Sequence, residues 1–186
     1  MIDHFDLIAP LYDWFIGTPD TKQLRYLLQL PTRGRLLDVG GGTGRVSSRL
    51  RPWVGQVVIT DISRPMLKRA RARENLYPVE AKAESLPFPD EQFERILVVD
   101  SLHHFHNQPH AVRDLLRVLR PGGRLVIEEP DIRRFAVNVV ALAEKLALMG
   151  SHFHSPEEIH DMITAYGLSA GIERNNSFRA WIVADK

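Results

Sequence analysis

Apolar residues along this chain form short runs, and these runs alternate with segments in which apolar residues recur at helical spacing. Leu36, Leu37 and Val39 make up the first run, and similar runs follow as far as residue 130. A run of this length fits a strand that is buried on both faces of a sheet. We therefore predict five buried strands, which cover residues 35–39, 56–60, 78–82, 93–99 and the stretch after Gly123.

Helices are predicted between these strands. Within residues 109–119, the apolar positions Val112, Leu115, Leu116 and Leu119 lie on one helical face. Further helices are expected at 21–30, from 46, after an N-cap at Ser63 and after an N-cap at Ser155. Residues 168–174 and 178–184 predict a closing strand pair with a hairpin turn between them. The alternation of strands and helices is typical of an α/β protein.

Composition narrows the class of protein. With 186 residues and 44% hydrophobic content, the chain suits one globular domain over residues 1–186. Its net charge of +1 gives no strong attraction to nucleic acid or to anionic membranes. Because it has no cysteine, disulfides, thiolate metal sites and a cysteine nucleophile are excluded. No apolar run approaches membrane-spanning length and the first residues are acidic, so we expect a cytoplasmic protein.

A glycine-rich loop follows the first strand, and the opening of a helix follows the loop. The pattern is Asp38-x-Gly40-x-Gly42-x-Gly44. Such glycines let the backbone turn tightly and let a ligand lie against the main chain, at a helix end that favours negative groups. A dinucleotide fingerprint requires a glycine where this chain has Arg45, and no G-K-[ST] follows. The loop therefore predicts a nucleotide site of another kind.

The glycine loop resembles motif I of the S-adenosylmethionine-dependent methyltransferases with a Rossmann-like fold. Three other segments resemble that class in order and spacing: Ala9–Phe15 (APLYDWF), Asp61–Leu67 (DISRPML) and the L-x-P-G-G-x-L pattern at residues 119–125. The first of these is similar to the ubiquinone/menaquinone-biosynthesis type. The resemblance implies a methyltransferase that uses S-adenosylmethionine and releases S-adenosylhomocysteine. It also implies a three-layer fold with a mixed seven-stranded sheet, in the order 3-2-1-4-5-7-6 with the last strand antiparallel.

The same resemblance implies how the remaining segments serve the site. Residues 1–30 would form a helical lid in which Tyr12 contacts the cofactor. Residues 131–152 would form an insertion that lines the substrate pocket, although their apolar stripe also suits a core helix or the face of a homodimer.

Asp61 is the predicted ribose ligand. It ends the second strand 17 residues after Gly44, close to where a carboxylate accepts both ribose hydroxyls, and Ser63 is the better cap for the next helix. By resemblance Ile62 packs on the adenine. The cofactor-binding set that we predict is Tyr12, Asp38, Gly40, Gly42, Gly44, Asp61, Ile62, Ala83, Glu84, Asp100 and Ser101.

Lys82 departs from the family pattern. Alignment on Leu86-Pro87-Phe88 places it where the family has an acid that accepts a hydrogen bond from the adenine amino group. Lysine has donors only. Either Glu84 or a water accepts that bond, or the Ala83 backbone and apolar packing alone hold the adenine.

The loop after the fourth strand, Asp100 to Phe105, lies where ligands bind in open α/β sheets. Asp100 and Ser101 are predicted to form a wall between the cofactor and the acceptor. His103 or His104 is a candidate general base, since imidazole titrates near neutral pH, and packing is the alternative role for both. The acids Glu128, Glu129 and Asp131 match no metal-binding spacing, so no metal site is predicted.

The acceptor is the least determined part of the prediction. Moderate charge and a short apolar insertion favour a small, partly apolar molecule over a nucleic acid. A methyltransferase acting on protein or RNA would share every cofactor residue, and a non-catalytic regulatory protein would bind the cofactor without turnover. A nicotinamide oxidoreductase is disfavoured by Arg45.

Overall fold

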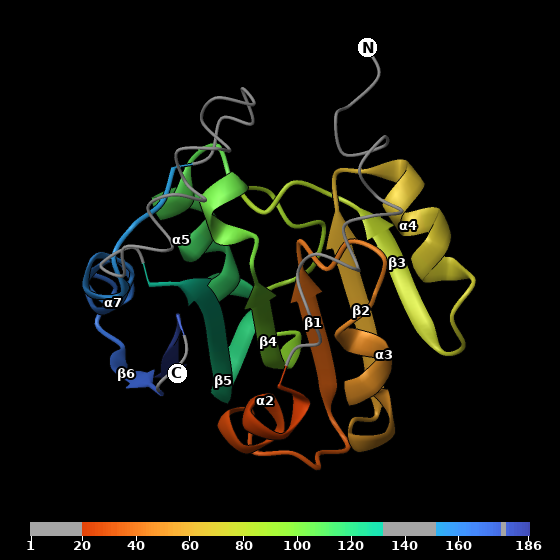
Figure 1. Ribbon diagram of the computed structural model, residues 1–186, viewed down its shortest axis with the longest axis horizontal. Helices are drawn as coiled ribbons and strands as arrows, with labels where there is room; N and C mark the ends of the chain where they lie inside the picture. The colour runs from red at the N-terminus through yellow and green to blue at the C-terminus, as the bar shows by residue number, and fades with distance from the viewer. Residues whose placement is uncertain (1–19, 132–151, 176–177) are drawn as a thin grey trace.

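The strands lie in one sheet, as the alternating pattern predicts. The computed structural model describes residues 20–131, 152–175 and 178–186. The sheet order is β3-β2-β1-β4-β5-β7-β6; β1 to β5 run parallel and β7 is antiparallel to both of its neighbours. Figure 1 shows the helices on both faces of this sheet. The predicted order and the antiparallel last strand are therefore confirmed.

The elements have the following bounds. The strands are β1 (Arg35–Val39), β2 (Gln56–Asp61), β3 (Leu76–Glu80), β4 (Phe93–Val99), β5 (Leu119–Pro130), β6 (Ser169–Arg174) and β7 (Arg179–Asp185). The helices are α2 (Thr21–Leu27), α3 (Ser47–Leu50), α4 (Arg64–Arg71), α5 (Gln108–Val118) and α7 (Pro156–Thr164). Short 3-10 turns cover Arg51–Trp53 and Leu102–His104.

Two hydrophobic clusters pack on opposite faces of the sheet. One joins the sheet to α2, α3 and α4, and it contains Leu36 of β1. The other joins the sheet to α5 and α7, and it contains Leu37, the next residue along. Successive side chains of a strand point to opposite faces, so both must be apolar when helices cover both faces. This double burial explains the apolar runs.

Predicted caps fix the starts of two helices. The Ser63 hydroxyl accepts a hydrogen bond from the Met66 N–H at 3.4 Å and begins α4. At α7, Ser155 and Glu158 form a reciprocal capping box, in which each side chain accepts from the other residue's N–H.

Several boundaries differ from the prediction for local reasons. The helix predicted over residues 21–30 ends at Leu27, because Gln29 adopts a left-handed φ of 51° and Leu30 precedes a proline. The third strand begins at Leu76, where it pairs with Val57 of β2. The Pro-Gly-Gly turn predicted before the fifth strand lies inside β5: Leu119 pairs with Phe93, and pairing resumes only at Arg124.

Some predicted features lie outside the described residues. These are Tyr12 and most of the lid predicted over residues 1–30, nearly all of the insertion at 131–152, and residues 176–177 of the hairpin turn. Across the parts of the chain that the structure describes, no helix is both long and apolar enough to span a membrane.

Candidate functional site

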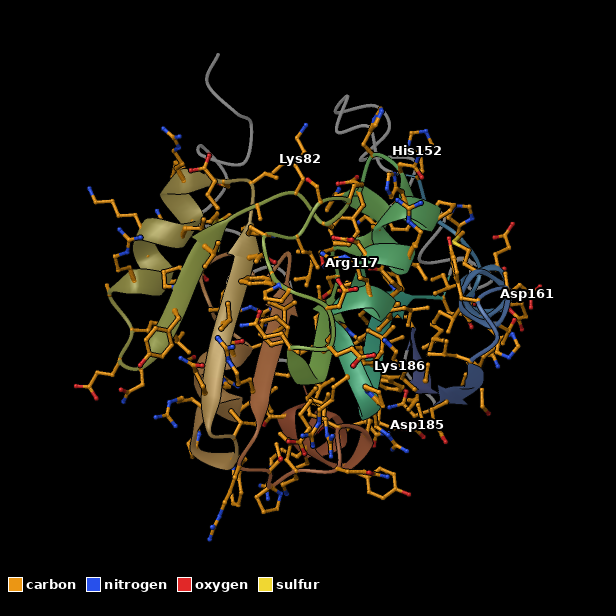
Figure 2. The ribbon with its side chains drawn as sticks, turned by 180° about the vertical axis from the view of Figure 1, so that it is seen from behind. Lys82, Arg117, His152, Asp161, Asp185 and Lys186 are labelled. Carbon is orange, nitrogen blue, oxygen red and sulfur yellow. The ribbon has the colours of Figure 1, made fainter. Side chains whose placement is uncertain are left out.

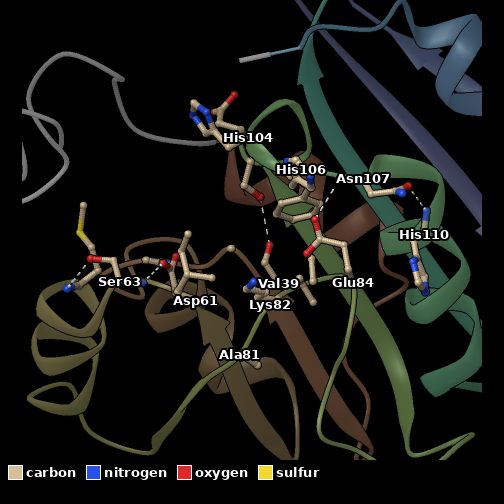
Figure 3. Close-up of a pocket in the computed structure, with 18 residues that line it drawn as sticks. Val39, Asp61, Ser63, Ala81, Lys82, Glu84, His104, His106, Asn107 and His110 are labelled. Carbon is tan, nitrogen blue, oxygen red and sulfur yellow. Dashed lines mark hydrogen bonds between the residues drawn. The ribbon is translucent and has the colours of Figure 1, made fainter. Parts of the chain in front are cut away.

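The carboxyl ends of β1, β2 and β4 meet around a cavity of about 460 Å³. Figure 3 shows the side chains that surround it. Its walls come from the glycine loop, the stretch from the end of β2 to the start of α4, the segment after β3, and the segment from Asp100 to the start of α5. Eight of the predicted cofactor residues line it: Gly40, Gly42, Asp61, Ile62, Ala83, Glu84, Asp100 and Ser101.

The glycine loop lies against neighbouring strand ends. The N–H groups of Gly40 and Gly41 both donate to the carbonyl of Thr60, at 2.8 and 3.1 Å, and this ties the end of β1 to β2. Gly40 has a φ of +71°, and a Cβ there would stand 2.5 Å from the Ser101 hydroxyl. Glycine at this position therefore permits the loop after β4 to approach the loop after β1 closely.

Gly44 packs against the neighbouring strands and does not line the cavity. It is absent from the cavity lining, and a Cβ on it would stand 2.8 Å from a methyl of Leu76 and 3.0 Å from a methyl of Ile59. The structure therefore places this predicted cofactor residue in the packing between the loop and the neighbouring strands.

Asp61 is oriented by backbone amides. One carboxylate oxygen accepts from the Gly42 N–H at 2.9 Å, and the other accepts from the Ser63 N–H at 2.8 Å. A carboxylate oxygen can accept two hydrogen bonds, so a carboxylate oriented in this way at a cavity can also accept from a ligand. This arrangement suits recognition of two neighbouring hydroxyl groups.

Asp38 lies behind the glycine loop. Its side chain is buried, accepts a 2.6 Å hydrogen bond from the Ser47 hydroxyl, and lines a smaller recess of about 70 Å³ beside Gly42 and Arg45. Burial raises the pKa of Asp38 to about 6, against the lowering effect of Ser47. The structure does not place Asp38 in the main cavity.

The segments after β2 and β3 form two further parts of the wall. Ile62, directly after β2, is 65% exposed beside the cavity, which leaves an apolar surface open to a flat ring. Ala83, after β3, also lines the cavity and is buried. Glu84 accepts a 3.0 Å hydrogen bond from the Asn107 N–H and so joins this segment to the start of α5 (Figure 3). Lys82 is exposed at the rim (Figures 2 and 3).

The two candidate bases occupy different positions. His104 lines the cavity, and burial, followed by the neighbouring His103, lowers the pKa of His104 to about 4. His103 does not line it: its ring is stacked on Phe153 and its Nδ1 lies 2.5 Å from a carboxylate oxygen of Glu129. Only His104 is thus placed to meet a ligand directly, in its neutral form at pH 7.

Sequence reasoning missed two residues behind this wall. Glu129 accepts hydrogen bonds from the N–H groups of Ser101 and Leu102, at 3.0 and 2.7 Å. Arg179 of β7 donates to both oxygens of Asp100, each at 2.7 Å. Strand alternation places Glu128 and Glu129 on opposite faces, but no signal in the sequence connects Arg179 with a residue 79 positions earlier.

No cluster of three or more histidine, aspartate or glutamate side chains is placed to hold a metal ion among the residues that the structure covers. The cavity has apolar walls and few oriented polar groups, which is the character of an organic ligand site.

Comparison with known proteins gives consistent matches. Residues 37–127 match the family described as "Methyltransferase domain". Over 105 residues, 51% of the chain, the sequence is 43% identical to the ubiquinone/menaquinone biosynthesis C-methyltransferase UbiE of Pseudomonas entomophila. That alignment covers 41% of the relative, so the chain spans well under half the length of the curated relatives that it matches.

Solved structures match over more of the chain. The YcgJ protein of Bacillus subtilis is 25% identical with a TM-score of 0.74, over 83% of this chain and 70% of that one. A SAM-dependent methyltransferase of Thermotoga maritima has a TM-score of 0.82 at 21% identity, over 97% of both chains. The second likeness shows a shared fold.

Proposed function

This chain belongs to the class I, Rossmann-like S-adenosylmethionine-dependent methyltransferases, and from that premise we propose that it transfers the methyl group of S-adenosylmethionine to a small, partly apolar acceptor. The observation that carries the proposal is Asp61, which two backbone amides fix at the mouth of a nucleoside-sized cavity.

The residues around the cavity fit this cofactor. The backbone at Gly40 and Gly42 has positive φ and lies against the cavity, where side chains would obstruct a ligand. Asp61 would accept the ribose hydroxyls, and the adenine would lie between Ile62 and Ala83. Asp100 and Ser101 would bound the methionine part, where a carboxylate attracts its cationic groups.

S-adenosylmethionine supplies a methyl group already activated by the positive sulfonium. The protein therefore acts mainly by holding the acceptor in line with that methyl group, a proximity effect worth up to roughly 7–11 kcal/mol. His104 is the residue that would take a proton from an acceptor which must lose one, because it is neutral and lines the cavity. Its low pKa makes it a weak base, which suits an acceptor that is already acidic.

The small acceptor is supported by two observations. The cavity walls are mainly apolar, and the curated relatives are named for quinone biosynthesis. A net charge of +1 gives no general attraction to nucleic acid. Tyr12, a homodimer and a cytoplasmic location stay predictions from the sequence.

The test is calorimetric titration with S-adenosylhomocysteine. We expect micromolar or tighter binding by the wild type and loss of that binding in Asp61→Ala. Glu80→Ala is the matched control, since Glu80 pairs with Asp61 in the sheet register and forms an exposed ion pair with Arg64 away from the cavity. Absence of wild-type binding would remove the proposed function.

If the cofactor binds, labelled methyl transfer into fractionated lysate decides the acceptor class. Label in the small-molecule fraction supports the proposal, whereas label in protein or RNA would replace it with a macromolecular methyltransferase. Binding without transfer into any fraction would indicate a regulatory protein.

A further inference from the structure

A buried ionic cluster lies behind the cavity wall, and it joins three strands. Arg179 of β7 donates from Nη1 to both oxygens of Asp100 and, at 2.5 Å, to Glu128. The second oxygen of Glu128 accepts from the indole N–H of Trp181 at 2.7 Å. Of these residues Asp100 is the one that lines the cavity.

The backbone brings the two carboxylates together. The Asp100 N–H donates to the Glu128 carbonyl at 3.0 Å, so the end of β4 is fixed against β5. Asp100 also adopts a left-handed φ of 50°, which turns the chain toward the cavity as β4 ends. When Asp100 and Glu128 are both charged they repel each other, and burial adds to the free-energy cost of charging both.

Arg179 opposes that cost. Burial raises the pKa of Asp100 and of Glu128, while the guanidinium of Arg179 lowers both. Both pKa values stay raised even with the guanidinium in place, so its removal would raise them further and favour protonation of the pair.

We propose that Arg179 is a positioning residue of the cofactor site: by pairing with Glu128 and holding both oxygens of Asp100, it fixes the Asp100 carboxylate at the cavity wall and favours its ionised form. Its role is indirect, since Arg179 itself is not part of the cavity lining. The inference rests on the proposed function, because the charge on Asp100 matters to the cationic groups of the cofactor.

Other charged groups also face Asp100. Glu129 raises the pKa of Asp100 and His103 lowers it, and these two lie in contact with each other. Both residues are unchanged in the variants below, so their contribution cancels in a ratio of variant to wild-type affinity.

The experiment measures S-adenosylhomocysteine affinity between pH 6 and 8 for wild type and Arg179→Met. We expect the variant to bind at least about tenfold more weakly at pH 6, with the ratio recovering by up to about tenfold per pH unit as Asp100 ionises. Arg179→Lys retains the charge and should follow the wild type. An unchanged affinity, or a loss independent of pH, overturns the proposal.

Arg124→Met is the matched control. Arg124 forms a two-bond pair with Asp185 between the same two strands, β5 and β7, and it does not line the cavity. We expect this variant to bind as the wild type does at every pH. A pH-dependent loss in Arg124→Met would show that the effect is not specific to Arg179.

A second measurement does not depend on the ligand. The indole of Trp181 is hydrogen-bonded to Glu128, so its fluorescence reports protonation of the cluster. We expect Arg179→Met to show this transition at a higher pH than the wild type, because the cation that lowers the pKa of Glu128 is removed. In the double variant Glu128→Gln/Arg179→Met, which lacks the second acid, the transition should be absent. If Arg179→Met fails to fold, the double variant should still bind cofactor; no binding there overturns the proposal. If the wild type binds no cofactor, the fluorescence result still decides the role of Arg179.

Discussion

The carboxylates of Asp61 and Asp100 line the cavity, those of Asp38 and Glu129 lie behind it, and the four are held by different sets of partners. Backbone amides hold Asp61, a hydroxyl holds Asp38, amides and an imidazole hold Glu129, and a guanidinium holds Asp100. A buried carboxylate without such partners would take up a proton. The hydrogen-bond partners therefore fix the orientation of each carboxylate.

Asp38 should make the protein less stable as pH rises from about 4 to 6. Burial raises the pKa of Asp38 from 3.8 to about 6, so the folded state binds this proton more tightly than the unfolded chain. The resulting stabilisation is complete below pH 3.8 and is lost as pH rises through 6. We expect Asp38→Asn to gain about 3 kcal/mol relative to wild type over this interval in urea unfolding, since Ser47 can donate to the amide oxygen.

Asp114→Asn is the control with the opposite sign. Although burial opposes it, hydrogen bonds from Arg117 and Leu86 lower the pKa of Asp114. Its stabilisation is present above the unfolded pKa and is lost on acidification, so this variant should lose stability relative to wild type as pH rises. A shared direction in both variants would contradict the argument.

Lys82→Asp should tighten binding of S-adenosylhomocysteine. Lys82 lies at the cavity rim and offers only donors, whereas an aspartate there could accept from the adenine amino group. Calorimetry measures the change, and Lys68→Asp on the exposed side of α4 controls for the altered net charge. Unchanged or weaker affinity would show that Lys82 is directed elsewhere.

At the scale of elements, the glycine loop depends on both φ and contact. Gly40 and Gly122 have nearly equal φ, +71° and +72°, but a Cβ on Gly40 would collide with Ser101 while one on Gly122 meets nothing within 4 Å. Comparing alanine substitutions at these two glycines separates the cost of backbone strain from the cost of steric conflict with Ser101.

We expect Gly122→Ala to cost about 1–2 kcal/mol of folding stability, the penalty for a left-handed alanine. Gly40→Ala should cost about 1–3 kcal/mol more and weaken cofactor binding, because Ser101 must move. Denaturant unfolding and calorimetry measure the two effects. Equal losses in both variants would mean that the contact with Ser101 relaxes freely.

At the scale of the whole molecule, the sheet connects two cores that share no helix within residues 20–131, 152–175 and 178–186. Leu36 and Leu37 are both fully buried, one in each cluster. We expect Leu36→Ala and Leu37→Ala each to lower the unfolding free energy by about 2–5 kcal/mol. Circular dichroism and tryptophan fluorescence should give coincident transitions, because β1, β2, β4, β5 and β7 each contribute residues to both cores. Separate transitions in either variant would show that the faces unfold independently.

Resemblance to a known family implied the sheet order, whereas the sequence by itself determined the strands, the glycine loop, two helix caps and most of the cavity wall. These features depend on local signals: apolar runs for strands buried on both faces, glycines for positive φ, and serines before a first helical turn. Asp61 lies beside the glycine loop, as its position in the sequence predicts, because β1 and β2 are adjacent parallel strands whose carboxyl ends meet at one edge.

Only the tertiary structure decided which residues stand behind that wall. Asp38 and Gly44 belong to motif I, yet they pack beneath the loop instead of lining the main cavity. His103 and His104 are adjacent in sequence, but only His104 lines the cavity. Arg179 meets Asp100 because the last strand is inserted antiparallel beside β5, a long-range pairing whose partners no local pattern encodes.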